Sequence, residues 1–237
     1  MSGLDGFGWG VIATAVAVAV VHTLLGPDHY LPFIMIGRAR RWSAAKTMVV
    51  TMLCGFGHVA SSVFLGVAGL AFGWTLGRIQ AAEGLRGNLS AWILVAFGTA
   101  YAAWGARHAY RRSRGIVTHA HQGHVHLHAH GDHDHGHARD MSGKSVTFWT
   151  LFAVFVLGPC EPLVPLFILP ASRGLWGLAA ATALIFGVVT IACMALMTGA
   201  GMAGVQRLPL GPLERWSHAL AGAVIALSGL SVVALGL

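Results

Sequence analysis

Ionisable side chains stand at two breaks in otherwise apolar stretches of the chain. A Gly-Pro step precedes them both times, in the motifs Leu25-Gly26-Pro27-Asp28-His29 and Leu157-Gly158-Pro159-Cys160-Glu161. Carboxylate and imidazole groups are costly to place in lipid, so such positions are expected to serve binding or transport. The alternative is a pair of proline kinks that serve helix packing alone. Kinks, however, do not require ionisable neighbours.

Two further histidines lie at helical spacing from potential ligands. His22 precedes His29 by two helical turns, and Cys54 precedes His58 by one turn, so each pair shares a face of a continuous helix. Imidazoles combined with carboxylates suit a divalent first-row metal such as nickel, cobalt or zinc, whereas calcium and magnesium prefer oxygen ligands. We predict a metal site whose ligands are His22, Asp28, His29, His58 and Glu161, with Cys54 and Cys160 as further candidates.

Each member of this set also has a structural interpretation. A single buried histidine, such as His22 or His58, is often a hydrogen-bonded structural group. Cysteines in apolar helices are mostly small packing residues. The Asp28-His29 pair and Glu161, at the equivalent place in the second motif, have fewer structural explanations.

A second concentration of metal-binding side chains is a histidine-rich tract over 119–137. Its histidines are His119, His121, His124, His126, His128, His130, His133, His135 and His137. A tract of this composition cannot bury a core and is expected to form a loop with many weak, exchangeable sites for transition metals. A hydrophilic or pH-sensitive linker is the alternative.

The elements that must position these residues are membrane helices. The 237 residues are 56% hydrophobic and 10% charged, with a mean hydropathy of +0.69, which is typical of an integral membrane protein. Apolar stretches long enough to cross a bilayer lie at 9–36, 46–72, 89–109, 146–169, 174–202 and 215–236. The first residues lack the basic region of a cleavable signal peptide, so the first stretch is expected to remain as a helix of the fold.

The distribution of Lys and Arg predicts the orientation, because cytoplasmic loops retain positive charge. The connections after the first, third and fifth stretches carry Arg38, Arg40, Arg41, Lys46, Arg107, Arg111, Arg112, Arg114, Arg139, Lys144, Arg207 and Arg215. The other connections carry Arg78, Arg86 and Arg173. Both termini are therefore predicted outside and the histidine-rich loop in the cytoplasm. This topology accounts for the net charge of +7 with the lipid bilayer as partner and no nucleic acid.

The chain also contains an internal repeat. The first motif matches the second, Phe56-Gly57 matches Phe186-Gly187, and Gly98 matches Gly229, all at nearly constant offsets. Because the halves enter the membrane from opposite sides, we predict an all-α fold of six transmembrane helices in two inverted three-helix repeats, with helices one and four broken. The units are 1–110, a loop at 111–145, and 146–237. Inverted repeats with helices broken near the midplane are typical of transporters.

His22 followed by Asp28-His29 resembles the His-x4-Asp-His signature of the nickel/cobalt transporters of the NiCoT and NicO type, including UreH-like members. Gly57-His58 followed by Ser61 resembles that family's second histidine helix, and the histidine-rich tract resembles the loop of its efflux members. The resemblance implies a divalent metal as substrate, bound by these residues during permeation. One departure is that five residues, rather than four, separate His22 from Asp28.

Gly158-Pro159-Cys160-Glu161-Pro162 also resembles the Pro-Cys breaks of membrane thiol relays of the CcdA/DsbD type. Their chemistry needs a cysteine at each break, and the first break here has none. The sequence therefore predicts a metal transporter of the cell membrane and not an enzyme. Uptake is slightly favoured over export, and the alternative is the thiol relay. No Walker-type nucleotide motif is present, and the sequence predicts no oligomeric state.

Overall fold

The computed structural model describes residues 6–113, 117–121, 124–128, 142–207 and 211–235. Its elements, in chain order, are α1 (Gly6–Leu25), the 3₁₀ turn η1 (Pro27–His29), α2 (Leu31–Ala39), α3 (Ala44–Ala71), α4 (Leu76–Ser113), β1 (Val117–His121), β2 (His124–His128), α5 (Ser142–Leu157), α6 (Leu163–Ser172), α7 (Trp176–Arg207), the 3₁₀ segment η2 (Gly211–Trp216) and α8 (Ser217–Leu235). In these ranges the protein is all-α apart from one short antiparallel strand pair.

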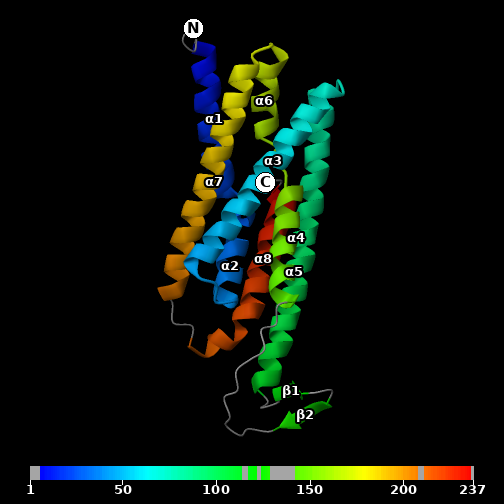
Figure 1. Cartoon of the computed structure of the whole chain (residues 1–237), viewed down its shortest axis with the longest axis vertical. Helices are drawn as coiled ribbons and strands as arrows, with labels where there is room; N and C mark the ends of the chain where they lie inside the picture. Colours follow the sequence, from blue (N-terminus) through cyan, green and yellow to red (C-terminus); the bar gives the residue numbers. More distant parts are fainter. Residues whose placement is uncertain (1–5, 114–116, 122–123, 129–141, 208–210, 236–237) are drawn as a thin grey trace.

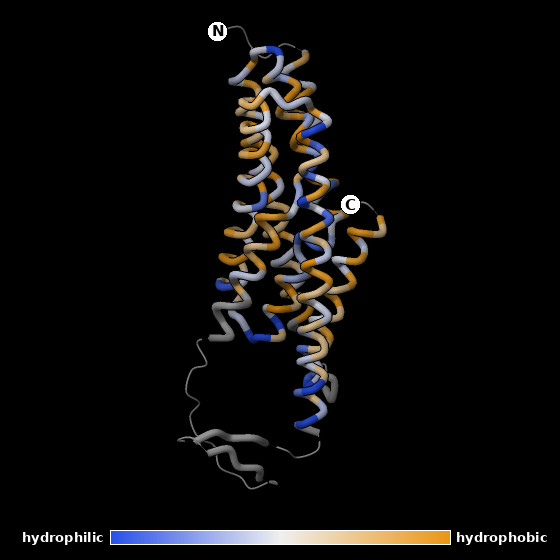
Figure 2. The backbone as a smooth tube through the Cα atoms, turned by 90° about the vertical axis from the view of Figure 1, so that its right-hand side faces the viewer, coloured by the Kyte–Doolittle hydropathy of each residue, from blue (hydrophilic) through white to orange (hydrophobic). Residues whose placement is uncertain are grey.

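Within the described residues, five helices are long and apolar enough to cross a membrane, namely α1, α3, α4, α7 and α8. The predicted span 146–169 is divided between the shorter helices α5 and α6, and the predicted span 9–36 between α1 and α2. Large apolar side chains such as Phe64, Leu85 and Leu196 are more than two thirds exposed on the outer surface, and apolar residues predominate along the helices (Figure 2). Such a surface is suited to lipid, which makes this an integral membrane protein.

Helices α1 and α5 both end at a Gly-Pro step. The last bond of α1 runs from the Gly26 N–H to the His22 carbonyl at 3.0 Å, and the Gly158 N–H bonds the Val154 carbonyl at 2.8 Å. The following proline has no N–H to continue either helix. The chain then makes a short irregular segment before α2 or α6 begins, so carbonyl and side-chain groups at each break are free for other partners.

The turns between crossings are closed by a recurring helix-ending motif. At the end of α2 the Trp42 N–H bonds the Gly37 carbonyl, and at the end of α6 the Leu175 N–H bonds the Pro170 carbonyl. The residue before each donor has a positive φ, 51° at Arg41 and 73° at Gly174. This left-handed residue is the signature of a Schellman motif.

The third predicted span, 89–109, is too short. Helix α4 begins at Leu76 and continues to Ser113, so Arg78 and Arg86, which the sequence assigned to a connection, lie within the helix. The sequence-based boundary is wrong because Glu83 and Arg86 lower the hydropathy of this segment, whereas in the fold they neutralise one another at a distance of 2.6 Å.

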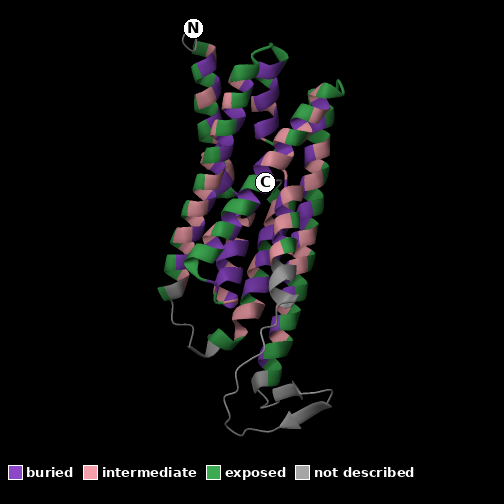
Figure 3. Cartoon of the chain, viewed as in Figure 1, coloured by how far each residue is buried: buried purple, intermediate pink, exposed green. Residues whose placement is uncertain are grey.

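The helices form an elongated bundle (Figure 1). Together α1 and α2 run from the N-terminal end towards the end that carries the strands, while α5 and α6 together run the opposite way. The short helices that follow the breaks, α2 and α6, bury most of their residues (Figure 3).

Helices α4 and α8 pack with their backbones in contact. A Cβ added at Gly98 would lie 2.8 Å from the Gly222 carbonyl oxygen, and one added at Gly222 would lie 2.6 Å from the Gly98 carbonyl oxygen. The two helices therefore approach as closely as their main chains allow at this pair of glycines.

The histidine-rich tract contains the strands, where the sequence predicted a loop. β1 and β2 pair antiparallel, with His119 opposite His126 and His121 opposite His124. Alternating residues with β-branched Val and Thr among them are compatible with strand pairing. His130, His133, His135 and His137 lie outside the described residues.

Candidate metal centre

Three histidines from separate elements converge at the first helix break. His22 lies in the last turn of α1, His29 in the turn η1, and His58 in the middle of α3. Their ring centroids are 4.7 Å apart for His22 and His29, 5.1 Å for His29 and His58, and 6.4 Å for His22 and His58. The break at Gly26 lets the chain turn so that His29 lies against His22.

The tautomers of two of these rings are fixed by main-chain carbonyls at the helix ends. His29 Nδ1 lies 3.2 Å from the Gly26 oxygen, and His58 Nδ1 lies 3.3 Å from the Phe155 oxygen, near the end of α5. A carbonyl only accepts a hydrogen bond, so each Nδ1 carries the proton. In the neutral form of each ring the lone pair is therefore on Nε2, which is the arrangement of a metal-binding imidazole.

The Nε2 atoms are the unusual feature of the cluster. Those of His22, His29 and His58 are all buried, and none has a hydrogen-bond partner among the described residues. His29 and His58 are 4% and 3% exposed. Buried polar atoms are paired in most proteins, so three unpaired nitrogens in one cluster indicate a missing partner. A metal ion is one electron-pair acceptor that could pair with such nitrogens, and those of His22 and His58 lie close enough to share one.

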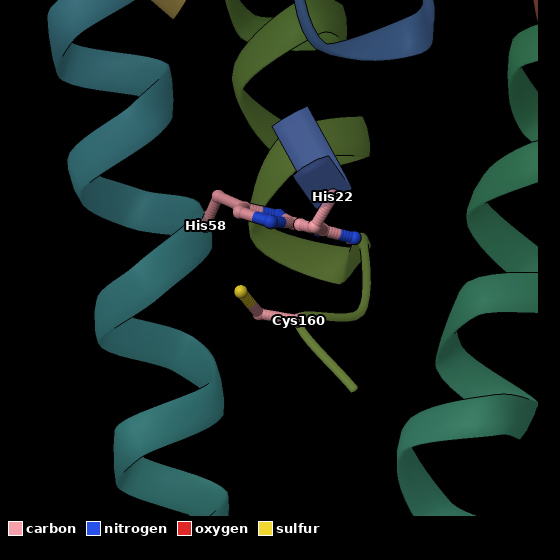
Figure 4. Close-up of side chains that lie close together, drawn as sticks. All are labelled: His22, His58 and Cys160. Atoms are coloured by element: carbon pink, nitrogen blue, oxygen red, sulfur yellow. The ribbon is translucent and has the colours of Figure 1, made fainter. Parts of the chain in front are cut away.

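Cys160 approaches the same place from the break between α5 and α6. One ligand atom each of His22, His58 and Cys160 lies within 4.8 Å of the others. In Figure 4 both imidazoles project into a common space, and the sulfur of Cys160 points towards them. The side chain of Cys160 is fully buried. Two imidazoles and a thiol at this separation can hold a metal ion after small side-chain movements.

A small cavity of about 30 Å³ is lined by the three histidines and by Asp28. The Asp28 Oδ1 atom is 3.2 Å from His29 Nδ1. The Asp28 carboxylate thus contacts one nitrogen of the His29 ring and leaves the other, Nε2, for a metal. Carboxylate-histidine pairs that orient metal ligands have the same arrangement. The space is of the size that one ion or one water molecule occupies.

Comparison of the chain with protein-family models, with curated proteins and with solved structures finds no match. The function is therefore inferred from the geometry of the cluster.

The remaining candidates from the sequence lie apart from this cluster. Cys54 is buried in an apolar cluster with Phe33, Val50 and Met194. Glu161 lines a second, wider cavity of about 400 Å³ between α1 and the break, to which His22 also contributes. The histidines of strands β1 and β2 follow the end of α4. The structure brings together His22, Asp28, His29, His58 and Cys160, and it places Cys54 and Glu161 outside that group.

A polar network beside the cluster was not predicted from the sequence. Glu83 and Arg86 on α4 join Ser61 and Ser62 on α3 and the backbone of the α5–α6 break. The sequence signal was an acid and a base three residues apart, which face each other on a helix. It was not recognised because this segment was assigned to a connection.

Proposed function

We propose that this protein transports a divalent transition-metal ion across the cell membrane, with the His22, His29, His58 and Cys160 cluster as its binding site. The supporting observation is the set of three buried Nε2 atoms that have no hydrogen-bond partner within the described part of the chain, next to a buried thiol. Ionisable groups within membrane-spanning segments are rare and mark substrate pathways in transporters.

The donor set defines the class of metal. Imidazole nitrogen and thiolate sulfur favour nickel, cobalt or zinc over magnesium or calcium. On metal binding the thiol loses its proton. The Cys160 thiolate and the Asp28 carboxylate then offset the two charges of the ion, so the loaded site is close to neutral and inexpensive to keep in lipid. The resemblance noted in the sequence favours nickel and cobalt.

We further propose that the two halves form an inverted repeat, which would expose the site alternately to each side. Three observations support this. The two broken pairs, α1 with α2 and α5 with α6, run in opposite directions. The Schellman motifs at 37–42 and 170–175 follow the two breaks at almost the same distance along the chain. The packing is also reciprocal, since α1 contacts α7 as α5 contacts α3, and α2 contacts α7 as α6 contacts α3.

The charge distribution supports an orientation with the strand end of the bundle in the cytoplasm and both termini outside. A histidine-rich segment on the cytoplasmic side suits either release of imported metal or collection for export. We propose uptake, which the intramembrane motif favours.

The thiol-relay alternative receives less support. Cys54, Cys160 and Cys193 are all free, and both Cys54 and Cys160 are fully buried. A relay needs a reactive thiolate that a partner can reach. Disulfide trapping of Cys160 with another cysteine of the chain would favour the relay.

The test is the nickel and cobalt content of metal-supplemented cells that express the native chain or a variant at equal membrane levels. His58→Ala and Asp28→Ala are expected to abolish the change that the native chain produces. His108→Ala removes an exposed histidine of α4 outside the cluster and is expected to behave like the native chain. A rise in metal content indicates uptake, and a fall indicates export. Equal metal content in native, variant and empty cells would contradict nickel and cobalt transport.

A further inference from the structure

A buried ion pair on α4 lies beside the cluster and takes no part in binding as described so far. Glu83 is fully buried, and its Oε1 atom accepts a hydrogen bond of 2.6 Å from Arg86 Nη1. The Arg86 side chain is 20% exposed. Two charges at this depth of a membrane bundle lose most of their hydration, so the pair requires further polar partners.

The arginine finds its partners at the end of α5. Arg86 Nη2 donates to the Val156 carbonyl at 2.7 Å and lies 3.4 Å from the Gly158 carbonyl. These carbonyls have lost their helical donors because the helix stops at Pro159. A guanidinium group there also faces the negative end of the α5 dipole. Pro159 sets where the fourth crossing breaks, and Arg86 holds the carbonyl groups at that break in place.

The glutamate fixes the next part of the same break. Glu83 Oε2 accepts hydrogen bonds from the Ser62 hydroxyl at 3.0 Å and from the Cys160 N–H at 3.2 Å. Ser62 Oγ accepts from the same Cys160 N–H at 3.1 Å. The backbone of Cys160 is thus held by residues of α3 and α4, while its sulfur lies near the imidazoles of His22 and His58.

The network also reaches the turn that carries His58. Arg86 Nη2 donates to Ser61 Oγ at 2.7 Å, and the Ser61 hydroxyl donates to the His58 carbonyl at 2.8 Å. One ion pair is therefore connected to the backbone of two members of the cluster, His58 and Cys160.

We propose that Glu83 and Arg86 are positioning residues that hold Cys160 at the distance from His22 and His58 at which its thiolate joins them in coordinating the metal. This inference rests on the proposed function. The site would then bind the metal through both imidazole and thiolate groups. The thiolate gives the preference for borderline and soft metals, and the Glu83–Arg86 pair maintains that preference without contacting the ion. Without the pair, the segment from Gly158 to Glu161 loses its fixed position, and the imidazoles remain as the only ordered nitrogen and sulfur donors.

Cobalt(II) absorption of the purified full-length protein tests this, because coordination by a thiolate adds a sulfur-to-cobalt charge-transfer band to the weaker bands that imidazole ligands produce. The native protein is expected to show this band, and Cys160→Ser to lack it. Cys54→Ser, which changes a cysteine outside the cluster, keeps it. Glu83→Gln is expected to lose most of the band while still binding cobalt, with an affinity lowered by about 10- to 100-fold, as is common when an outer partner of a ligand is removed.

Conservative variants separate positioning from general stability. Arg86→Lys keeps the charge but not the planar fork, and it is expected to retain more of the band than Arg86→Gln. Ser62→Ala removes one acceptor of the Cys160 N–H and one donor to the Glu83 carboxylate, but it leaves the ion pair of Glu83 with Arg86 in place. It is expected to weaken the band even if Glu83→Gln does not fold. A native band and native affinity in Ser62→Ala, and in Glu83→Gln where it folds, would overturn the inference. Absence of cobalt binding by the native protein would instead overturn the proposed function.

Discussion

The two helix breaks have the same Gly-Pro sequence, but they are stabilised in different ways. The first, at Gly26, is closed by its own residues, since the Gly26 carbonyl accepts from the backbone N–H and from Nδ1 of His29. The second, at Gly158, is held by Arg86 and Glu83 of another helix.

The two breaks therefore differ in how the geometry of their side chains is determined. At the first break a compact 3₁₀ turn carries both the proposed ligand His29 and its carboxylate partner Asp28, so the geometry of this pair is local and depends on few residues. At the second break the proposed ligand is Cys160, whose place depends on tertiary contacts. Substitutions at the first break are therefore expected to affect metal binding more than folding, and those around the second to affect both.

The largest effect on stability is expected from removing Arg86, the residue of α4 that binds the second break. Arg86→Ala leaves the Glu83 carboxylate buried without its charge partner, which should lower the free energy of unfolding by about 3–5 kcal/mol. Denaturant unfolding in detergent micelles measures this. The double change Glu83→Gln with Arg86→Gln should cost less, because no lone charge remains.

The matched change at the first break is Tyr30→Phe, which removes only an exposed hydroxyl bond of 3.4 Å to the Leu24 carbonyl. Its effect should stay within about 0.5 kcal/mol. Equal destabilisation by Arg86→Ala and Tyr30→Phe would show that the two breaks do not differ as argued.

Gly26→Ala should produce the largest loss of metal binding with little loss of stability. The added Cβ would lie 2.5 Å from His29 Nδ1 and 3.0 Å from Asp28 Oδ1, so the ring must leave its position. We expect cobalt affinity to fall by about 10- to 100-fold, measured by titration of the purified protein. Native affinity in this variant would argue against His29 as a ligand.

Asp28→Asn removes the charge of the first break but keeps an oxygen that accepts from His29 Nδ1. Since the ion then lacks one of its two compensating negative charges, cobalt affinity should fall by about tenfold. Isothermal titration calorimetry of native and variant protein measures the difference. A change as large as that of Gly26→Ala would instead indicate that Asp28 coordinates the ion directly.

Gly158→Ala is the counterpart of Gly26→Ala and should have the smallest effect. Its Cβ would lie 3.2 Å from both His58 Nδ1 and the Phe155 carbonyl oxygen, contacts that shifts of a few tenths of an ångström relieve. The loss of cobalt affinity should remain below about tenfold, equivalent to about 1.4 kcal/mol. If Gly158→Ala weakens binding more than Gly26→Ala does in the same titration, the second break controls the imidazoles more tightly than the first.

The breaks were predictable because Gly-Pro steps are local signals that end helices wherever they occur. The proximity of His22 to His29 was also predictable from their spacing. The relative places of Cys160 and Glu161 were not, since the direction of each side chain after a break depends on how Arg86 and Glu83 hold the backbone. The ligand roles of all these residues remain predictions.

The pair on α4 escaped the sequence analysis for a related reason. Hydropathy scores a charged residue as polar whether or not it has a partner, so two compensating charges shortened the predicted span. Only the fold reveals that Glu83 and Arg86 face each other and the end of another helix.

The interlocked glycines of α4 and α8 constrain how this bundle can move. Because Gly98 and Gly222 each receive the backbone of the opposite helix, sliding of one helix along the other would force main-chain atoms into collision. This close contact of α4 with α8 joins the N-terminal and C-terminal halves of the chain. In the alternating access proposed above, we therefore expect access to the histidines to change by rotation at other helix contacts, such as those of α1 with α7 and of α3 with α5.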